Sequence, residues 1–178
     1  MRYLDEKEAE SIKKYYYRAI ELLKKSDCKE ANYGAVIFKD DEVIGEGYNY
    51  VPKIYGYTCD KCPRRNNDLH KGIGLELCYS VHAEESAIND MIFNKGHKRS
   101  DSKGSNMIVV RAKNGEHYIF KTFKPYCTRC AEKIYTQTDI NEIIYEEGDK
   151  FIALKRDELF NISIINLHEN WKEKFDIK

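Results

Sequence analysis

The sequence lacks a long hydrophobic segment. Charged side chains make up 34% of its 178 residues, and no run is long or apolar enough to cross a bilayer or to act as a secretory signal. These absences argue against a helical membrane protein and against a membrane partner. We therefore expect a cytoplasmic protein.

The sequence also lacks an excess of charge of either sign. Thirty Lys and Arg residues balance thirty Asp and Glu residues, so the formal net charge is zero. Proteins that bind the phosphate backbone usually carry a basic excess or a basic face. A nucleic-acid partner is therefore disfavoured, although residues 95–103 could form a local basic face.

Internal repeats and low-complexity segments are absent as well. A chain of 178 residues can bury a sizeable core without disulfides, so we predict one domain over residues 1–178. The six cysteines comprise two Cys-x-x-Cys pairs, together with Cys28 and Cys78. This pattern favours metal binding in a reducing compartment over a disulfide scaffold. Cys28 itself carries no signal of a role.

The hydrophobic periodicity alternates between helices and strands, which predicts a layered α/β sheet. We expect a last edge strand at either 151–154 or 162–165, and then a charged helix. The expected helices span about 5–25, 81–93 and 127–136, and the expected strands span 34–38, 43–47, 106–111 and 142–145.

Three segments interrupt this alternation. Residues 50–80 form a long loop, and loops of that length usually serve a purpose. Residues 94–105 form a polar excursion with no core residues, and 112–124 form a second insertion. Within the second insertion, Tyr118 to Phe120 could return as a hairpin after the Asn114-Gly115 turn.

His82, Cys127 and Cys130 have the composition of a zinc site. A histidine and two closely spaced cysteines supply three ligands, and a catalytic zinc keeps its fourth position for water, whose pKa it lowers to about 7. Taken alone, His82 is more often an ordinary core or surface residue, and the cysteine pair a structural zinc knuckle. Together with Glu84, they favour a catalytic centre.

Glu84 is predicted to carry protons at this centre. It follows His82 by two residues, so on a helix it projects about 200° away and would sit beside the metal without binding it. A carboxyl group in that position can take a proton from water and pass it to a base. Glu85 projects from a different helix face and is expected to be solvated.

The His82-Ala83-Glu84 triplet and the later Cys127-x-x-Cys130 resemble the cytidine deaminase superfamily, whose signature joins His-x-Glu to Pro-Cys-x-x-Cys. The resemblance implies a three-layer α/β/α fold around a mixed sheet of about five strands. It also implies zinc-dependent hydrolytic deamination of a cytosine nucleotide. The segments Gly47–Asn49 and Cys62–Arg64 are most similar to those of deoxycytidylate deaminases, which convert dCMP to dUMP and ammonia.

The resemblance assigns substrate contacts to three further residues. Asn49 would bind the sugar, and the backbone N–H of Ala83 would bind the cytosine carbonyl oxygen. Tyr126 intervenes between Pro125 and Cys127, at the carbonyl that the family aims at the amino group of the base. Gly47–Asn49 could equally be an ordinary strand-ending turn.

The 50–80 loop offers two additional candidate sites. Cys59, Cys62 and Cys78, with His70 as fourth ligand, could bind a structural zinc, or the thiols could simply pack as small apolar groups. Arg64, Arg65 and Lys71 could bind a 5′-phosphate or form a solvated face.

Two rival functions remain open at this point. One is a deaminase acting on single-stranded DNA or on RNA, including tRNA, and the other is a zinc-stabilised binding module without catalysis. The neutral charge favours a small nucleotide over a polynucleotide, and the retention of Glu84 argues against the module. We also expect a homo-oligomer.

Overall fold

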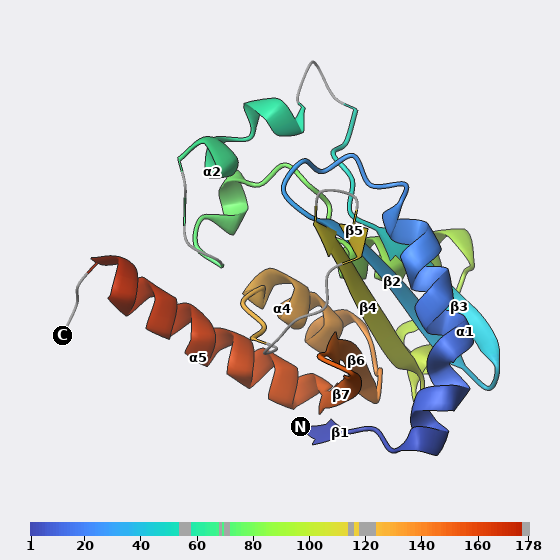
Figure 1. Cartoon of the computed structure of the whole chain (residues 1–178). Coiled ribbons are helices and arrows are strands. Elements are labelled where there is room, and N and C mark those ends of the chain that lie inside the picture. The colour runs from blue at the N-terminus through green and yellow to red at the C-terminus, as the bar shows by residue number, and fades with distance from the viewer. Residues whose placement is uncertain (54–57, 68, 70–71, 114–115, 118–123, 176–178) are drawn as a thin grey trace.

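The computed structural model describes residues 1–53, 58–67, 69, 72–113, 116–117 and 124–175. Its central feature is one mixed sheet with the strand order β1-β7-β6-β4-β2-β3, and β5 pairs with the end of β4 (Figure 1). The strands are β1 (Arg2–Tyr3), β2 (Asn32–Lys39), β3 (Glu42–Tyr48), β4 (Asn106–Lys113), β5 (Glu116–His117), β6 (Glu142–Glu147) and β7 (Lys150–Lys155).

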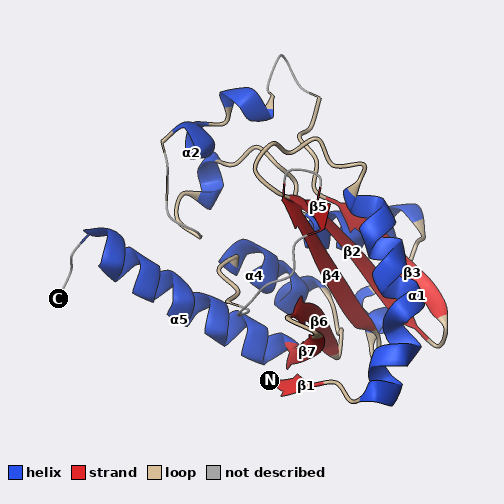
Figure 2. Cartoon of the chain, viewed as in Figure 1, coloured by secondary structure: helices blue, strands red, loops and turns tan. Residues whose placement is uncertain are grey.

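Helices cover both faces of this sheet, which makes the molecule a three-layer α/β/α structure (Figure 2). One core packs α1 against the sheet, and the other core packs α3, α4 and α5 against the opposite face. The helices are α1 (Glu6–Leu23), α2 (Pro63–Asn66), α3 (Ala83–Asn89), α4 (Thr128–Gln137) and α5 (Arg156–Phe175).

The centre of the sheet follows from its apolar strands. The β2 residues from Gly34 to Phe38 are buried, as are Met107 to Val110 of β4, because both faces of these strands carry helices. β4 and β6 pair in parallel, with Met107 opposite Ile143, whereas the other strand pairs are antiparallel. A parallel pair needs a crossover connection, and α4 lies in that connection.

The strands predicted at 34–38 and 43–47 are confirmed as β2 and β3, which pair as a two-residue hairpin. Its two turn residues, Asp40 and Asp41, have φ angles of 47° and 68°. Positive φ at both central residues is the type I′ geometry, whose twist matches that of paired strands. The hairpin ends at Tyr48, directly before Asn49.

Two glycines let helices lie directly on the sheet. A Cβ atom on Gly34 would stand 2.1 Å from the carbonyl oxygen of Ala19 in α1. A Cβ atom on Gly47 would stand 2.4 Å from the backbone nitrogen of Ala87 in α3. The absence of side chains at these positions therefore sets how closely α1 and α3 approach, and with α3 the position of the residues at its start.

The expected three-layer fold with a mixed sheet is confirmed, and the structure adds two short strands and decides between the two candidates for the last strand. The sheet has seven strands where about five were expected, because β1 and β5 contribute only two residues each and leave no periodic pattern. Of the two candidates for the last strand, 150–155 forms β7, and Ile162 to Ile165 lie inside α5. Short apolar runs do not distinguish a strand from a buried helical turn.

The polar excursion at 94–105 also differs from its prediction. It was expected to contribute nothing to the core, yet Ser102 and Ser105 are fully buried. The Ser102 hydroxyl donates to the carbonyl of Arg99 at 2.6 Å and accepts from the backbone N–H of Asp139 at 2.7 Å. Satisfied hydroxyls can be buried at little cost, which composition alone does not reveal. The predicted return strand at Tyr118 to Phe120 lies outside the described residues.

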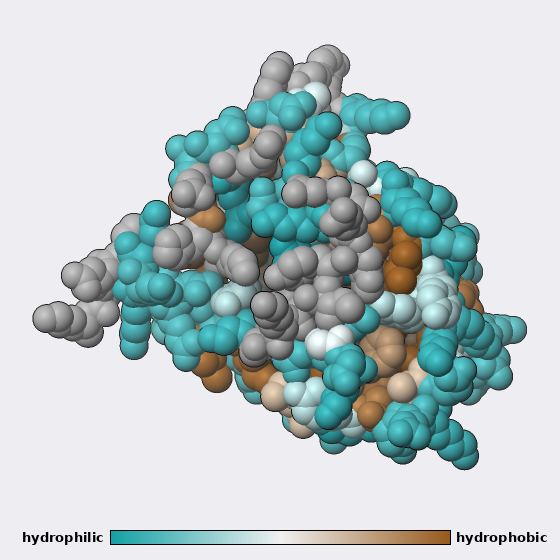
Figure 3. Space-filling model, viewed as in Figure 1, coloured by the Kyte–Doolittle hydropathy of each residue, from teal (hydrophilic) through white to brown (hydrophobic). Residues whose placement is uncertain are grey.

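The visible surface in Figure 3 is mainly hydrophilic, with apolar side chains in small separate groups. No helix within the described part of the chain is long and apolar enough to span a bilayer.

Candidate zinc centre and substrate pocket

His82, Cys127 and Cys130 meet at the starts of two helices. His82 is the residue before α3, and Cys127 is the residue before α4. The Nδ1 atom of His82 lies 3.0 Å from the Sγ atom of Cys130 and 3.3 Å from that of Cys127. All three donor atoms lie within 4.8 Å of one another.

This donor set fits zinc. Zn–S bonds of about 2.3 Å and Zn–N bonds of about 2.0–2.1 Å in a tetrahedral site place the donor atoms roughly 3.5–3.8 Å apart. The observed contacts of 3.0 and 3.3 Å need only small outward shifts to admit an ion. The three side chains would leave a fourth position open.

The start of α4 favours a thiolate at Cys127. The Sγ atom of Cys127 accepts a hydrogen bond from the backbone N–H of Cys130 at 3.3 Å, as the N-cap of the helix. A hydrogen bond to Cys130, which outweighs burial, together with the His82 partner, holds the pKa of Cys127 well below its usual range. Burial raises the pKa of the Cys130 thiol instead.

The pKa of His82 is also shifted from its usual value. Burial disfavours the charged imidazolium, but hydrogen bonds to Cys127 and Cys78 outweigh it and raise the pKa of His82 to about 10. Zinc binds neutral histidine and thiolates, so metal uptake by this set would release protons.

Glu84 is buried beside these donors, with 9% of its surface exposed. Burial first, and then the negative charge of Cys127, raise the pKa of its carboxyl group. A carboxyl group with a raised pKa holds a proton more readily near neutral pH, which suits transfer in both directions.

Glu85 does not occupy the environment that was expected of it. It was predicted to be solvated, but its side chain is 18% exposed and pairs with Lys133 and, at 3.9 Å, with Arg129. The cause is the packing of α4 against α3, which brings two basic side chains to the outer flank of the centre. Glu84 and Glu85 thus face different partners.

A cavity of about 340 Å³ opens above the centre. Its lining includes His82, Glu84, Cys127 and Cys130, and also three residues of the predicted substrate set, Asn49, Ala83 and Tyr126.

Two of those three residues, Asn49 and Tyr126, already make hydrogen bonds within the protein. The amide oxygen of Asn49 accepts from the N–H of Tyr33 at 2.7 Å, and its amide nitrogen donates to the carbonyl of Ala31 at 2.8 Å. Each amide atom keeps capacity for one more hydrogen bond. Ala83 begins α3, where the first N–H groups have no partner within the helix. The carbonyl of Tyr126 accepts from the N–H of Thr128 at 3.0 Å.

Three basic side chains line the same cavity. Arg64 was a sequence candidate, and its Nε donates to the carbonyl of Ile73 at 3.0 Å. Arg111 and Lys124 were missed. The guanidinium of Arg111 lies 5.7 Å from the ring centre of Tyr33. A charged residue inside the apolar run of β4 was the available signal for Arg111. Lys71 and the side chain of Arg65 lie outside the described part of the chain.

The cysteines of the 50–80 loop lie next to this centre, and one of them, Cys78, also contacts His82 and lines the substrate cavity. Cys59, Cys62 and Cys78 line a smaller neighbouring cavity, and Cys28 lines it with them. The Sγ atoms of Cys28 and Cys59 are 3.8 Å apart, a neighbourhood that the sequence did not indicate for Cys28. His70 lies outside the described residues.

A His/Cys/Cys donor set beside a buried carboxyl group is the arrangement of a hydrolytic zinc centre. Residues 9–147 match the family described as the cytidine and deoxycytidylate deaminase zinc-binding region. The chain belongs to this family, which confirms the resemblance seen in its sequence.

Individual relatives agree with the family match. The deoxycytidylate deaminase of Schizosaccharomyces pombe is 33% identical over 125 residues, covering 68% of this chain and 32% of that protein. The deoxycytidylate deaminase of Mycobacterium phage D29 is 39% identical over 69 residues, covering 36% of this chain and 53% of that protein. The chain thus spans about a third to a half of these relatives.

One solved structure shows the same fold over most of the chain. It is the dCMP deaminase of the cyanophage S-TIM5 in complex with dCMP and dUMP, with a TM-score of 0.50 and 20% identity. The match covers 90% of this chain and 92% of that one.

Proposed function

We propose that this protein hydrolyses the amino group of a cytosine nucleotide, converting dCMP to dUMP and ammonia. The observation that carries the proposal is the buried carboxyl group of Glu84 beside the donor atoms of His82, Cys127 and Cys130, at the base of a cavity lined by basic side chains. The curated relatives named above are deoxycytidylate deaminases, which supports this substrate.

His82, Cys127 and Cys130 would hold the zinc ion. Zinc bound there supplies a Lewis acid that makes water nucleophilic near neutral pH. Glu84 would accept one proton of the attacking water and deliver it to the ring nitrogen of cytosine. It would then take the proton of the new hydroxyl group on C4 and give it to the amino group, which leaves as ammonia as the C4 carbonyl forms. Burial raises the pKa of the carboxyl group, which favours its acting as both acceptor and donor of a proton.

The cavity would bind the rest of the nucleotide. The N–H of Ala83 and the carbonyl of Tyr126 would contact the cytosine base, and Asn49 would contact the sugar; all three residues line the cavity. Arg64, with Arg111 and Lys124, would meet the 5′-phosphate, because guanidinium and ammonium groups pair with phosphate oxygens. A polynucleotide substrate is disfavoured by the zero net charge.

The adjacent residues Glu84 and Glu85 allow a direct test of the mechanism by paired substitutions. Glu84→Gln keeps the side-chain shape but cannot carry a proton, so turnover of dCMP should fall by roughly 100- to 10,000-fold while zinc content is unchanged. Glu85→Gln is the matched control, because its partners are Lys133 and Arg129, and it should retain turnover within a few-fold. Ammonia release and elemental zinc are measured for both. Full activity of Glu84→Gln would refute the mechanism.

A substrate screen tests the nucleotide itself. Zinc-loaded protein is offered cytidine, deoxycytidine, CMP, dCMP and dCTP, and a cytosine-containing single-stranded oligonucleotide, with ultraviolet absorbance as the readout. The highest kcat/KM is expected for dCMP. Deamination of the oligonucleotide alone would show that the substrate is a polynucleotide. No reaction with any of the compounds would favour a binding module.

Three further features of this proposal come from the sequence. We infer one domain over residues 1–178, a homo-oligomer, and a cytoplasmic location. The charge balance and the absence of a long apolar run support the location. Light scattering of the purified protein measures the oligomeric state.

A further inference from the structure

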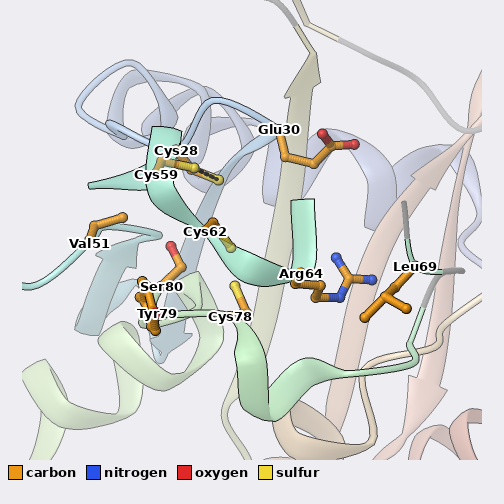
Figure 4. Close-up of a pocket in the computed structure, with 10 residues that line it drawn as sticks. All are labelled: Cys28, Glu30, Val51, Cys59, Cys62, Arg64, Leu69, Cys78, Tyr79 and Ser80. Atoms are coloured by element: carbon orange, nitrogen blue, oxygen red, sulfur yellow. Dashed lines mark hydrogen bonds between the residues drawn. The ribbon is translucent and has the colours of Figure 1, made fainter. Parts of the chain in front are cut away.

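A second cavity of about 90 Å³ holds four cysteines from three separate segments. Cys28 follows α1, Cys59 and Cys62 stand at the two ends of a short 3₁₀ helix (Cys59–Lys61), and Cys78 ends another (Leu75–Leu77). Figure 4 shows the sulfurs of Cys28 and Cys59 side by side, and those of Cys62 and Cys78 turned toward each other. Only two cysteines of the chain, Cys127 and Cys130, belong to the first centre.

The spacing of one sulfur pair already matches a metal site. A tetrahedral zinc with Zn–S bonds of about 2.3 Å places its sulfurs roughly 3.8 Å apart. The Sγ atoms of Cys28 and Cys59 are 3.8 Å apart, well beyond the roughly 2.05 Å of a disulfide. Among the described residues, no three of these four sulfurs lie within 4.8 Å of one another. A bound ion would therefore draw Cys62 and Cys78 inward.

The surroundings of the sulfurs suit metal ligands. Cys59 and Cys62 are buried, with 9% and 6% of their surface exposed. The Sγ atom of Cys59 accepts a hydrogen bond from the backbone N–H of Lys29 at 3.1 Å, a contact of the kind that orients and stabilises a ligating thiolate. The Sγ atom of Cys62 lies 3.7 Å from the carbonyl of Leu77, directly before Cys78.

We propose that Cys28, Cys59, Cys62 and Cys78 bind a structural zinc ion. Cys28 takes the place that the sequence had offered to His70. Four cysteines with one Cys-x-x-Cys pair form the closed ligand set of structural zinc sites, with no position for water. Binding removes four thiol protons and forms four Zn–S bonds, so no oxidant or reductant is needed.

The ion would fasten the wall of the substrate pocket. The regular structure described within residues 59–78 is short: one helix of four residues and two 3₁₀ helices of three residues each. Six of the residues that line the thiol cavity also line the substrate cavity, namely Cys28, Glu30, Arg64, Leu69, Cys78 and Ser80. A zinc crosslink would tie this wall to the end of α1 through Cys28.

Metal stoichiometry tests the proposal independently of enzymatic activity. Protein purified under reducing conditions with zinc present should contain two zinc ions per chain. Cys28→Ala and Cys59→Ala should each lose one ion and keep the other, and Cys127→Ala should lose the ion of the first centre. Ser26→Ala is the matched control. The hydroxyl of Ser26 accepts a hydrogen bond from the backbone N–H of Cys28 at 3.3 Å, but Ser26 is not a proposed ligand, so this variant should keep both ions.

A second measurement uses the unaltered chain, in case a cysteine variant does not fold. After exchange with cadmium, ¹¹³Cd resonance should show two signals, one of them at the position of four sulfur ligands. A single zinc per chain, with the four cysteines still open to a thiol reagent in the folded protein, would overturn the proposal. So would a disulfide between Cys28 and Cys59 in the freshly purified protein.

Discussion

At the residue scale, two neighbouring carboxyl groups have opposite surroundings. Glu84 is buried next to Cys127, whereas Glu85 pairs with Lys133 on the flank of the centre. Helix geometry separates successive side chains by about 100°, so a one-residue step changes the environment completely. The spacing to His82 singled out Glu84, but the partner of Glu85 comes from another helix and had no signal in the sequence.

A residue-scale prediction concerns Arg64 and the phosphate. If Arg64 binds the 5′-phosphate, Arg64→Gln removes a charged hydrogen bond worth about 1.5–3 kcal/mol, which is roughly a 10- to 150-fold loss in kcat/KM for dCMP. Deoxycytidine has no phosphate and is the internal control, so its much slower reaction should be unchanged. Steady-state kinetics on both substrates measures the effect.

The same kinetics distinguish phosphate binding by Arg64 from a purely structural role of this side chain in the loop. The Nε of Arg64 also donates to the carbonyl of Ile73, so the side chain could act by holding the loop alone. An equal loss of activity on dCMP and deoxycytidine would assign Arg64 to the loop and leave the phosphate to Arg111 and Lys124.

At the element scale, the contact between α3 and β3 positions His82 and Glu84 at the start of α3. Gly47 has no side chain, and Ala87 of α3 lies directly over it. The same helix begins with His82 as its cap and carries Glu84 in its first turn. In the sequence, Gly47-Tyr48-Asn49 resembles a motif of the family. The structure shows that Gly47 is also needed for the close packing of α3 on β3.

Gly47→Ala should therefore damage both stability and catalysis. The added methyl would lie 2.4 Å from the nitrogen of Ala87 and 2.7 Å from the carbonyl carbon of Ser86, which are backbone atoms that cannot turn aside. Overpacking of this kind costs about 1–3 kcal/mol. A displaced α3 would also misplace Glu84, and a shift near 1 Å can cost about 100-fold in rate. Urea unfolding and turnover per zinc-loaded chain measure the two effects.

Gly104→Ala is the control for this prediction. Gly104 has a φ angle of 80° and nothing within 4 Å of an added Cβ, so the change should cost about 1–2 kcal/mol through backbone strain alone. Turnover per zinc-loaded chain should stay at the level of the unaltered protein. Unchanged turnover in Gly47→Ala as well would show that α3 does not depend on this contact for its position.

At the scale of the whole molecule, Asp139 joins three distant parts of the chain. Its Oδ1 atom lies 3.0 Å from Arg99 of the 94–105 excursion and 2.8 Å from Arg156 at the start of α5. Hydrogen bonds to Arg156 and Arg99 lower the pKa of Asp139. A carboxyl group whose pKa is lower in the folded state stabilises the protein at every pH above its unfolded value of 3.8.

This linkage predicts a pH-dependent difference between two proteins. Asp139→Asn should lower the free energy of unfolding at neutral pH, and the difference from the unaltered chain should shrink as pH falls below 3.8 and Asp139 takes up a proton. Urea titrations across that range measure it. High salt should reduce the difference, since the group is partly exposed. A difference that persists undiminished in acid would mean that Asp139 acts through packing.

The sequence by itself determined the candidate ligand set, the candidate proton carrier and the alternation of helices with strands. Those features are recorded within short stretches, because ligand type, a two- or three-residue spacing and apolar periodicity are local properties. Only the tertiary structure decided which distant residues share a site: Cys28 beside Cys59, Arg111 in the substrate cavity, and Lys133 on Glu85. Periodicity shows which side of an element is buried, but the partner across the interface depends on how the layers pack.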